Sequence, residues 1–184
     1  GLLILAYFLS ALGFAGLWAK LAKTLQKHGA VALAAALCAL FQGGIVFIPA
    51  GNFPIALMAV ILAGLPYSAC ALILRAMTAD AGDEIRLETG VDRTGLLYAL
   101  LAGTSKLGYA VSVGATFPIL AAAGFNATGA GDPSRGLGAL TALYGFGPFV
   151  LAGLAIPLAL GYRLDAQRHG QIIEALPQRL MPDA

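Results

Sequence analysis

The chain has 184 residues, of which 59% are hydrophobic and 11% charged, and its mean hydropathy is +0.84. Ordinary soluble domains carry roughly 25% charged residues, so this composition predicts an integral membrane protein. The formal net charge of +2 is too small to indicate a nucleic-acid partner. Cys38 and Cys70 lie far apart in apolar sequence, which indicates small packing residues rather than a metal or redox pair.

Five apolar runs divide the chain, and each has the roughly 18 residues or more that a bilayer crossing requires. They are Leu2 to Ala19, Ala30 to Pro49, Phe53 to Leu74, Thr94 to Phe125 and Ala139 to Tyr162. The runs are continuous rather than alternating with a period of two, which favours helices over a barrel. We predict an all-α, polytopic membrane helix bundle with five transmembrane helices over residues 1–164 and a tail over residues 165–184. Because the chain opens inside an apolar run, we expect it to be a fragment of a larger bundle.

Basic residues concentrate in three of the segments that flank these runs. They are Lys20, Lys23 and Lys27; Arg75, Arg86 and Arg93; and Arg163, Arg168 and Arg179. By the positive-inside rule these three segments face the cytoplasm. We therefore expect a cytoplasmic carboxy terminus, with the amino terminus and the connections over residues 50–52 and 126–138 on the outer side.

Caps mark where helices begin. Asn52 and Pro54 predict the start of the third span, and Asp165 predicts the start of a short final helix that runs towards Ala175, before Pro177. The apolar residues of this last helix recur at helical spacing, which indicates an interfacial helix on the cytoplasmic surface. A frayed tail is the alternative.

Prolines interrupt spans three to five, at Pro66, Pro118, Pro148 and Pro157. They predict bends, with neighbouring helices or water binding the carbonyls that proline frees. Two pairs of small residues at i and i+4, Gly64 with Ser68 and Gly108 with Ser112, would allow close helix approach.

A single lysine, Lys106, lies inside the fourth run, which is otherwise uncharged from Thr94 to Gly124. At about 1.5 Å per residue it lies roughly 18 Å into the run, near the middle of a hydrocarbon core about 30 Å thick. A charge there costs at least about 2.5 to 3.5 kcal/mol, so Lys106 should face protein, water or ligand. It either lines a solute cavity or pairs with a carboxylate that locks two helices together.

The helix face around Lys106 is suited to a polar solute. At about 100° per residue it also holds Tyr98, Ala102, Gly103 and Tyr109. Aromatic rings stack on sugar rings, phenol hydroxyls bond to sugar hydroxyls, and small residues leave room. Tyr67 on the third span is a further candidate for binding. Tyr98 is equally suited to anchoring its helix at the membrane interface.

The densest group of charges lies between Arg75 and Arg93, where we expect a loop. Its charges could form a salt-bridge lattice that closes the cytoplasmic mouth and breaks on opening. The candidate gate residues are Asp80, Asp83, Arg86 and Arg93. The alternative is a solvated loop that only sets topology.

Three parts of the chain resemble one known family. The stretches MTADAGD at residues 77–83 and TGVDRTGLLYA at residues 89–99, together with Lys106, resemble the signature between the tenth and eleventh helices of the glycoside-pentoside-hexuronide:cation symporters. These melibiose permease-like carriers belong to the major facilitator superfamily. Residues 162–165, with Arg168, His169 and Ile172, resemble the segment after their twelfth helix.

The resemblance implies that the five spans are helices eight to twelve of a twelve-helix carrier, the carboxy-terminal part of its fold, in a bacterial inner membrane. It implies alternating access driven by a sodium ion or proton, which the missing amino-terminal half mainly binds, and no other cofactor. Lys106 then lies near the solute and cation sites, and spans one, three and four border the cavity. Glu84, Arg86 and Glu88 depart from the family pattern, so the pairing within the gate is not implied.

The leading hypothesis is therefore part of a secondary transporter, with symport of a sugar or related small solute. A carrier of lipids or other solutes in the same superfamily is the alternative. A membrane enzyme with a divalent metal at Asp80 and Asp83 is disfavoured, because Glu84 to Arg86 does not supply the familiar phosphatidyltransferase pattern. A purely structural subunit would be favoured only if the gene began near Gly1. The expected partners are the solute, the bilayer and the amino-terminal half.

Overall fold

The computed structural model describes residues 1–49, 51–125 and 133–180, without the side chains of residues 133–135 and 178–180. Its elements, in chain order, are α1 (Leu2–Gly13), α2 (Ala15–Thr24), α3 (Gln26–Gly44), the 3₁₀ helix η1 (Ile45–Phe47), α4 (Phe53–Gly64), α5 (Tyr67–Thr89), α6 (Thr94–Ala122), α7 (Pro133–Leu160) and α8 (Ala166–Leu180). No strand occurs in the described ranges.

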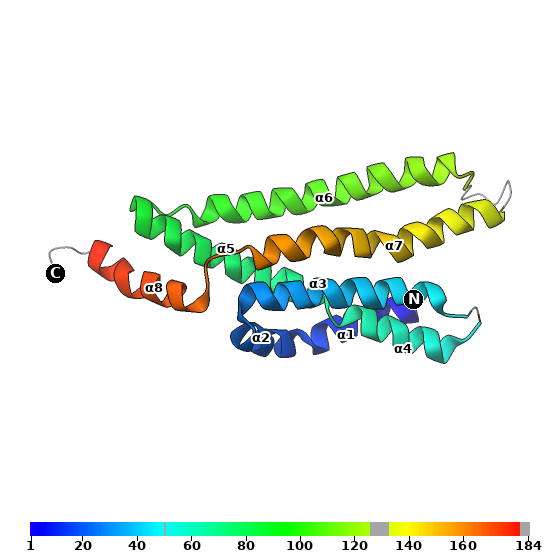
Figure 1. Cartoon of the computed structure of the whole chain (residues 1–184), viewed down its shortest axis with the longest axis horizontal. Helices are drawn as coiled ribbons and strands as arrows, with labels where there is room; N and C mark the ends of the chain where they lie inside the picture. Colours follow the sequence, from blue (N-terminus) through cyan, green and yellow to red (C-terminus); the bar gives the residue numbers. More distant parts are fainter. Residues whose placement is uncertain (50, 126–132, 181–184) are drawn as a thin grey trace.

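Five helical stretches are long and apolar enough to cross a membrane: Leu2–Thr24, Gln26–Phe47, Phe53–Thr89, Thr94–Ala122 and Gly136–Leu160. The first combines α1 and α2, and the third combines α4 and α5. The helices lie roughly along one long axis, with α6 along one edge and α8 at one end (Figure 1). The predicted all-α membrane bundle of five spans is confirmed.

Pro66 divides the third span, and a side chain of the first span binds one of the backbone carbonyls that the break leaves without a helical donor. The Ala69 N–H bonds to the Pro66 carbonyl at 3.1 Å, one residue short of the usual α-helical partner, Leu65. The Leu65 carbonyl instead accepts a hydrogen bond from Trp18 Nε1 at 2.8 Å. Trp18 is fully buried and packs with Ala30, so the repair lies inside the core. The predicted satisfaction of a freed carbonyl is confirmed at Pro66.

The same break frees a second carbonyl one turn earlier. The Leu65 N–H bonds to Leu62 at 3.3 Å, and the Ile61 carbonyl accepts from Ser10 Oγ at 2.6 Å. Close approach makes this contact possible, because a Cβ atom on Gly64 would overlap the Tyr7 carbonyl oxygen. The predicted close helix approach at Gly64 is therefore observed, between α1 and α4.

α3 and α7 also pack closely. A Cβ atom on Gly43 would overlap the ring of Phe149, and one on Gly145 would come within 2.9 Å of Val46 Cγ2. Spans one, two and three share a buried cluster around Trp18. The membrane-embedded core thus lies among α2, α3 and α5, with α7 packed on α3.

α6 differs from these helices, because Leu120 is its single buried residue. It contacts α5 and α7, and it runs along the edge of the molecule in Figure 1. Gly103 and Gly108 both face open space, where an added Cβ would meet nothing within 4 Å. Close approach at Gly108 is therefore not observed among the described residues.

The connection between spans three and four is mostly helix, so the predicted loop from Arg75 to Arg93 is wrong. α5 continues to Thr89 because its alanine, leucine, glutamate and arginine residues favour helix. It ends at Gly90, which has a φ of 75° and supplies the left-handed conformation of a helix C-cap.

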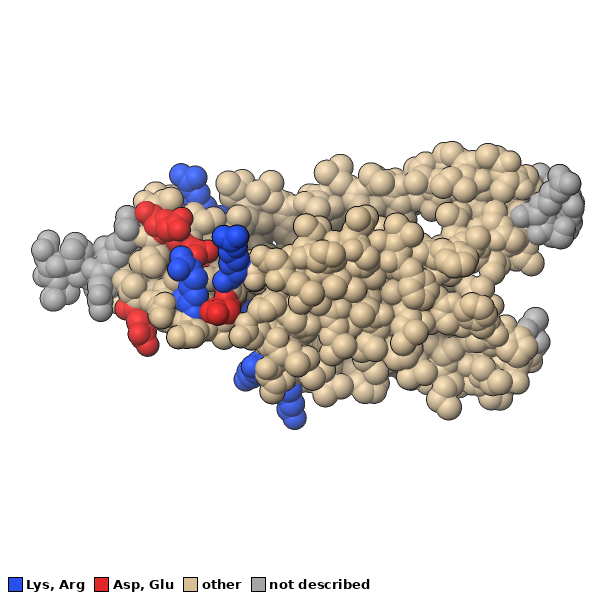
Figure 2. All heavy atoms as spheres, viewed as in Figure 1, with Lys and Arg blue, Asp and Glu red and all other residues tan. Residues whose placement is uncertain are grey.

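Charged side chains gather at one end of the molecule, over α8 and the far half of α5 (Figure 2). Lys27 contacts Asp80, and Arg168 contacts Glu84, so the three basic segments meet at this end as the topology prediction requires. That this end is cytoplasmic stays a prediction. The outer connection over residues 126–132 lies outside the described residues, as does the side chain of Arg179.

Two predicted caps are confirmed. The Ile55 N–H bonds to Asn52 Oδ1 at 3.3 Å at the start of α4, and the Arg168 N–H bonds to Asp165 Oδ1 at 2.8 Å at the start of α8. The predicted end of the last helix is wrong, because α8 includes Pro177 and continues to Leu180.

The apolar face of α8 packs on the protein. Ile172 and Leu176 are buried with Leu164 against Leu87 and Tyr162. A position of α8 on the membrane surface stays a prediction, since the contacts show only what these two residues pack against.

Candidate functional site

A groove of about 620 Å³ lies between α5 and α6, within the range of roughly 300 to 1,000 Å³ that is usual for small-molecule sites. α5 contributes Ala71, Leu74 and Arg75, and α6 contributes Tyr98, Leu101, Ala102, Ser105, Lys106 and Tyr109. Four of the six residues predicted to bind solute therefore share one groove: Tyr98, Ala102, Lys106 and Tyr109. That the groove binds solute stays a prediction.

Lys106 lies on the 13th residue of the 29-residue helix α6, near its middle. Its side chain is exposed, and within the described part of the chain it has no ion-pair partner. The carboxylate lock that would explain a buried lysine is therefore not formed by the described residues. The groove remains open to Lys106, as a solute site requires.

Tyr98 joins the two helices that form the groove. Its hydroxyl donates a hydrogen bond to the Arg75 carbonyl at 3.0 Å. The ring is thus fixed at the level of Arg75, where it forms part of the wall. Tyr109 is 72% exposed, and its ring is available to pack on a solute.

Gly103 and Tyr67 lie outside this groove. At about 100° per residue, Gly103 is some 60° beyond Lys106, which itself stands at the edge of the arc of lining residues. Tyr67 packs instead against two rings of α1, with ring centroids 5.4 Å from Tyr7 and 6.0 Å from Phe8. A binding role for either residue has no support from this groove and stays a prediction.

The sequence did not single out Arg75 or Ser105 as lining residues. Arg75 had been assigned to topology, yet antiparallel pairing of spans three and four places it beside Tyr98. Ser105 bonds to its own helix at the Leu101 carbonyl, 2.9 Å away. A predicted register between the two helices would have revealed Arg75.

A second group of polar side chains, which we call the inner cluster, consists of Lys27, Asp80, Asp83, Glu84, Arg168 and His169. Asp80 is 5% exposed; it forms an ion pair with Lys27, and its Oδ1 lies 3.4 Å from His169 Nε2. His169 Nε2 also lies 3.1 Å from Asp83 Oδ2, and Arg168 Nε lies 3.0 Å from Glu84 Oε1. The inner cluster therefore joins α5 to the start of α3 and to α8.

Two of the predicted gate residues, Asp80 and Asp83, belong to this cluster, and their partners are not among the predicted gate residues. Among the described residues, neither Arg86 nor Arg93 forms an ion pair with Asp80 or Asp83. The sequence places Lys27 in a basic segment that sets topology and His169 in the stretch that resembles the family segment after the twelfth helix. Neither pattern shows that the two side chains converge on Asp80. A gating role for these residues stays a prediction.

Two groups near the inner cluster have perturbed pKa values. Burial, and then the nearby carboxylates of Asp80 and Glu84, raise the pKa of Tyr162 to about 12. Its hydroxyl donates to the Met77 carbonyl at 3.2 Å. Hydrogen bonds from Thr94 hold the pKa of Asp92 below its ordinary value, with a smaller effect of Arg86; one of them is the Thr94 N–H, 2.9 Å from Asp92 Oδ1.

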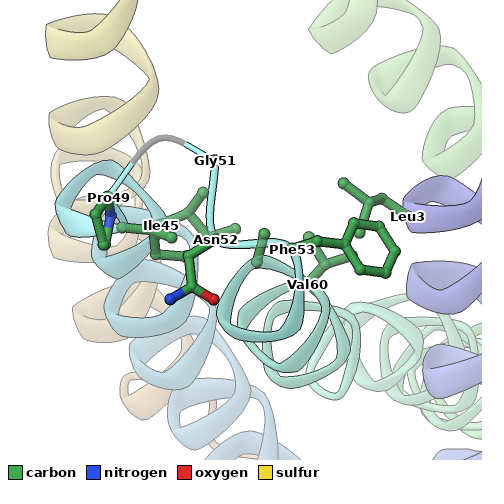
Figure 3. A pocket seen from close by; sticks show the side chains of 9 residues that line it. Leu3, Ile45, Pro49, Gly51, Asn52, Phe53 and Val60 are labelled. Carbon is green, nitrogen blue, oxygen red and sulfur yellow. The ribbon is translucent and has the colours of Figure 1, made fainter.

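Two further hollows are largely apolar. One of about 670 Å³ lies between α6 and α7, lined by Ala115, Ile119 and Phe146 among others. The other, of about 410 Å³, lies among α1, η1 with the segment after it, and α4 (Figure 3). Its polar side chain, Asn52, is engaged in capping α4. Neither has the polar groups of a solute site.

The family model described as MFS/sugar transport protein matches residues 1–166, which include all five spans and the groove. The chain belongs to this family. Membership in the MFS/sugar transport family, together with the five apolar helices, indicates an integral, multi-pass membrane transporter. A comparison with curated proteins finds no match.

Proposed function

We propose that this protein is part of a secondary transporter that moves a sugar or related small solute by alternating access, coupled to a sodium ion or proton. The observation that carries the proposal is the groove between α5 and α6, where an exposed lysine lies at membrane depth beside two tyrosines. Such a charge is costly in lipid and is typical of a solute or ion pathway. The resemblance to cation symporters supports the coupling.

In this proposal the five spans are helices eight to twelve of the carrier. An amino-terminal half covers the open side of the groove, packs on the bare face of α6 and supplies the carboxylates that bind the coupling cation. Solute contacts Lys106 and the ring of Tyr109, and rocking of the two halves exposes the groove to each side in turn. The carrier lies in a bacterial inner membrane with its carboxy terminus in the cytoplasm.

The inner cluster acts as part of the gate. Asp80 holds α3 and α5 together through Lys27, and His169 fastens α8 to the same helix. Opening on this side breaks some of these contacts, and closure restores them. Because Arg86 is half-buried and Arg93 is exposed, and neither binds Asp80 or Asp83 here, we propose that they pair with the other half in the closed state.

Transport by the full-length carrier tests the proposal. The carrier is reconstituted in vesicles, and uptake of ¹⁴C-labelled methyl glucoside and methyl glucuronide is measured with an inward sodium or proton gradient. Lys106→Ala should reduce gradient-driven uptake by tenfold or more. Lys23→Ala, which removes an exposed lysine outside the groove, should leave it unchanged. Equal uptake by wild type and Lys106→Ala would refute the role of Lys106.

A second candidate, a carrier of lipids, is favoured by one observation. The apolar hollow between α6 and α7 lies on the opposite side of α6 from Lys106, and its lining has no polar surface. An acyl chain would find no polar group there to desolvate. Uptake of a labelled lysophospholipid that competes with no sugar would favour this candidate.

A further inference from the structure

His169, on α8, places one ring nitrogen beside two carboxylates of α5. Its Nε2 atom lies 3.1 Å from Asp83 Oδ2 and 3.4 Å from Asp80 Oδ1. Ionised carboxylates only accept hydrogen bonds, so these contacts require a proton on Nε2. A neutral ring has that one proton, whereas a second proton on Nδ1 gives the ring a positive charge that faces both carboxylates. The contact therefore has a weaker and a stronger form, which differ by one proton.

The charges of the inner cluster do not balance without that second proton. α5 contributes three carboxylates, those of Asp80, Asp83 and Glu84, while the cations other than His169 are Lys27 and Arg168. Lys27 pairs with Asp80, and Arg168 pairs with Glu84. Among the described residues, the basic group that Asp83 contacts is His169. A charged His169 is thus the third cation and completes the balance.

Other polar groups beside the inner cluster do not supply that charge. The Tyr162 hydroxyl donates to a backbone carbonyl of α5, and its pKa is raised to about 12, so it stays neutral near pH 7. Asp165 accepts a hydrogen bond from a backbone N–H in the first turn of α8. His28, the second histidine of the chain, is half-buried on α3 and forms no ion pair within the described ranges.

Apolar and charged contacts together attach α8 to α5. Ile172 and Leu176 form the apolar part, and Ile172 is 4% exposed. The side chain of Arg168 is 58% exposed, so its ion pair is worth little. The side chains of His169 and Asp80 are 24% and 7% exposed, so their contact is less screened by solvent. The charged part of the attachment therefore depends mainly on His169.

We propose that His169 makes the attachment of α8 to α5 sensitive to pH. Histidine is the side chain that ordinarily changes its charge between about pH 5 and 8. On the acidic side of this range, the charged ring binds Asp80 and Asp83 and holds α8 against α5. On the alkaline side, the neutral ring keeps a weaker hydrogen bond, so α8 detaches more often. This inference concerns the attachment of α8 and goes beyond the proposed function.

For transport, the expected consequence rests on the proposed function. Asp80 contacts both Lys27 and His169, so one carboxylate joins α8, α5 and the start of α3. A charged His169 strengthens this end of the molecule in its present arrangement. If the inner cluster is part of the gate, acid on this side slows its opening.

The accessibility of a buried thiol on α8 measures the attachment. In the full-length carrier in detergent, Cys38 and Cys70 are replaced by alanine, and Ile172→Cys places a thiol on the buried face of α8. Gln171→Cys places a thiol on the exposed face as the reference. The rates of modification by N-ethylmaleimide are measured at pH 6 and pH 8. The ratio of the buried to the exposed thiol cancels the pH dependence of the thiol chemistry.

The ratio should rise about threefold or more from pH 6 to pH 8, a change of the size that one partly exposed charge pair supplies. His169→Gln, whose amide donates a hydrogen bond without a charge, should keep the ratio high at both pH values, and His169→Arg should keep it low. The matched control His28→Gln should retain the wild-type rise. A ratio that does not rise, a rise that persists in His169→Gln, or one that His28→Gln abolishes would overturn the proposal.

Hydrogen exchange of α8 repeats the comparison without a substitution at Ile172. Its rates at the two pH values, each divided by the intrinsic rate at that pH, should rise in the wild type and not in His169→Gln. An equal rise in both proteins would overturn the proposal.

These outcomes are separate from those of the transport experiment, because neither measurement on α8 requires a solute. If the ratio does not depend on pH while gradient-driven uptake requires Lys106, the transporter proposal stands and the pH-sensitive attachment is wrong. If the ratio depends on His169 while uptake is unaffected by Lys106→Ala, the attachment stands and the proposed role of the groove fails.

Discussion

Spans three and four both carry proline and polar groups at membrane depth, yet their surroundings differ. At Pro66 in span three, Trp18 and Ser10 bind the freed carbonyls of Leu65 and Ile61. In span four, Leu120 is the one buried residue, and Lys106 has no ion-pair partner among the described residues. The freed carbonyls of span three are bound by neighbouring helices, whereas the polar side chain of span four has no such partner among the described residues.

The difference separates structural from functional polarity. A polar group in lipid must be satisfied, so one that is satisfied internally stabilises the bundle. One that is left open must meet water, a solute or another part of the carrier. The substitutions below test whether span three is as closed, and span four as open, as their contacts indicate.

The largest effect on stability is expected at Gly64. Gly64→Val should lower the free energy of unfolding of the full-length carrier by about 3 kcal/mol, because its side chain would overlap the Tyr7 carbonyl oxygen. Gly108→Val on α6 should cost much less, since an added Cβ there meets nothing within 4 Å. Thermal unfolding in detergent measures both. An equal loss for the two variants would show that the proposed amino-terminal half covers α6 closely.

Trp18→Phe should have the next largest effect and lower the free energy of unfolding by about 2 kcal/mol. It leaves the Leu65 carbonyl without its donor in a fully buried site and opens a small cavity. Phe117→Leu on α6, where the side chain is 66% exposed, serves as the control and should change the unfolding temperature little. A smaller loss for Trp18→Phe than for this control would contradict a sealed span three.

The inner end of span three should depend on Asp80. Asp80→Asn weakens the contacts with Lys27 and His169 and should cost about 1 to 2 kcal/mol, less than a fully buried pair because both partners are partly exposed. Hydrogen exchange should rise in α8 and at the start of α3, with α6 unaffected. Unchanged exchange in α8 would show that its apolar contacts suffice to hold it.

The smallest effect should be a pH dependence at Tyr162. Its pKa is raised from 10.0 to about 12 because the fold favours the neutral phenol. This contribution to stability is complete below pH 10 and is lost as pH rises towards 12, since the unfolded chain ionises first. The unfolding temperature of Tyr162→Phe should therefore fall less than that of the wild type as pH rises from 10 towards 12. If the unfolding temperatures of the two proteins fell in parallel over this range, the prediction would be wrong.

The sequence predicted the number, type and approximate limits of the spans, because apolar length is local information. It also predicted the caps at Asn52 and Asp165, where one side chain bonds to a nearby backbone N–H. The extent of α5 was not predicted, because the dense charges between Arg75 and Arg93 indicated a loop. The helix in fact continues through these charges and ends at Gly90.

The candidate site was predicted only in part, because the sequence carries local information about one helix and not the register between two helices. Residues of one helix, Tyr98, Ala102, Lys106 and Tyr109, could be grouped by periodicity alone. Arg75 in the groove depends on the register between two helices, which periodicity within one helix cannot supply. The contacts of Asp80 with Lys27 and His169 join residues 53 and 89 positions apart along the chain, and similar charges occur throughout these segments.

The continuity of α5 has a mechanical consequence. From the bend at Pro66 the helix runs without interruption to Thr89, 23 residues or about 34 Å. If this helix tilted as a rigid rod about Pro66 by about 10°, its far end would be displaced by about 6 Å. Arg75 lies nearer to Pro66 and would move by a smaller distance. The wall of the groove and the carboxylates of the inner cluster would therefore move together.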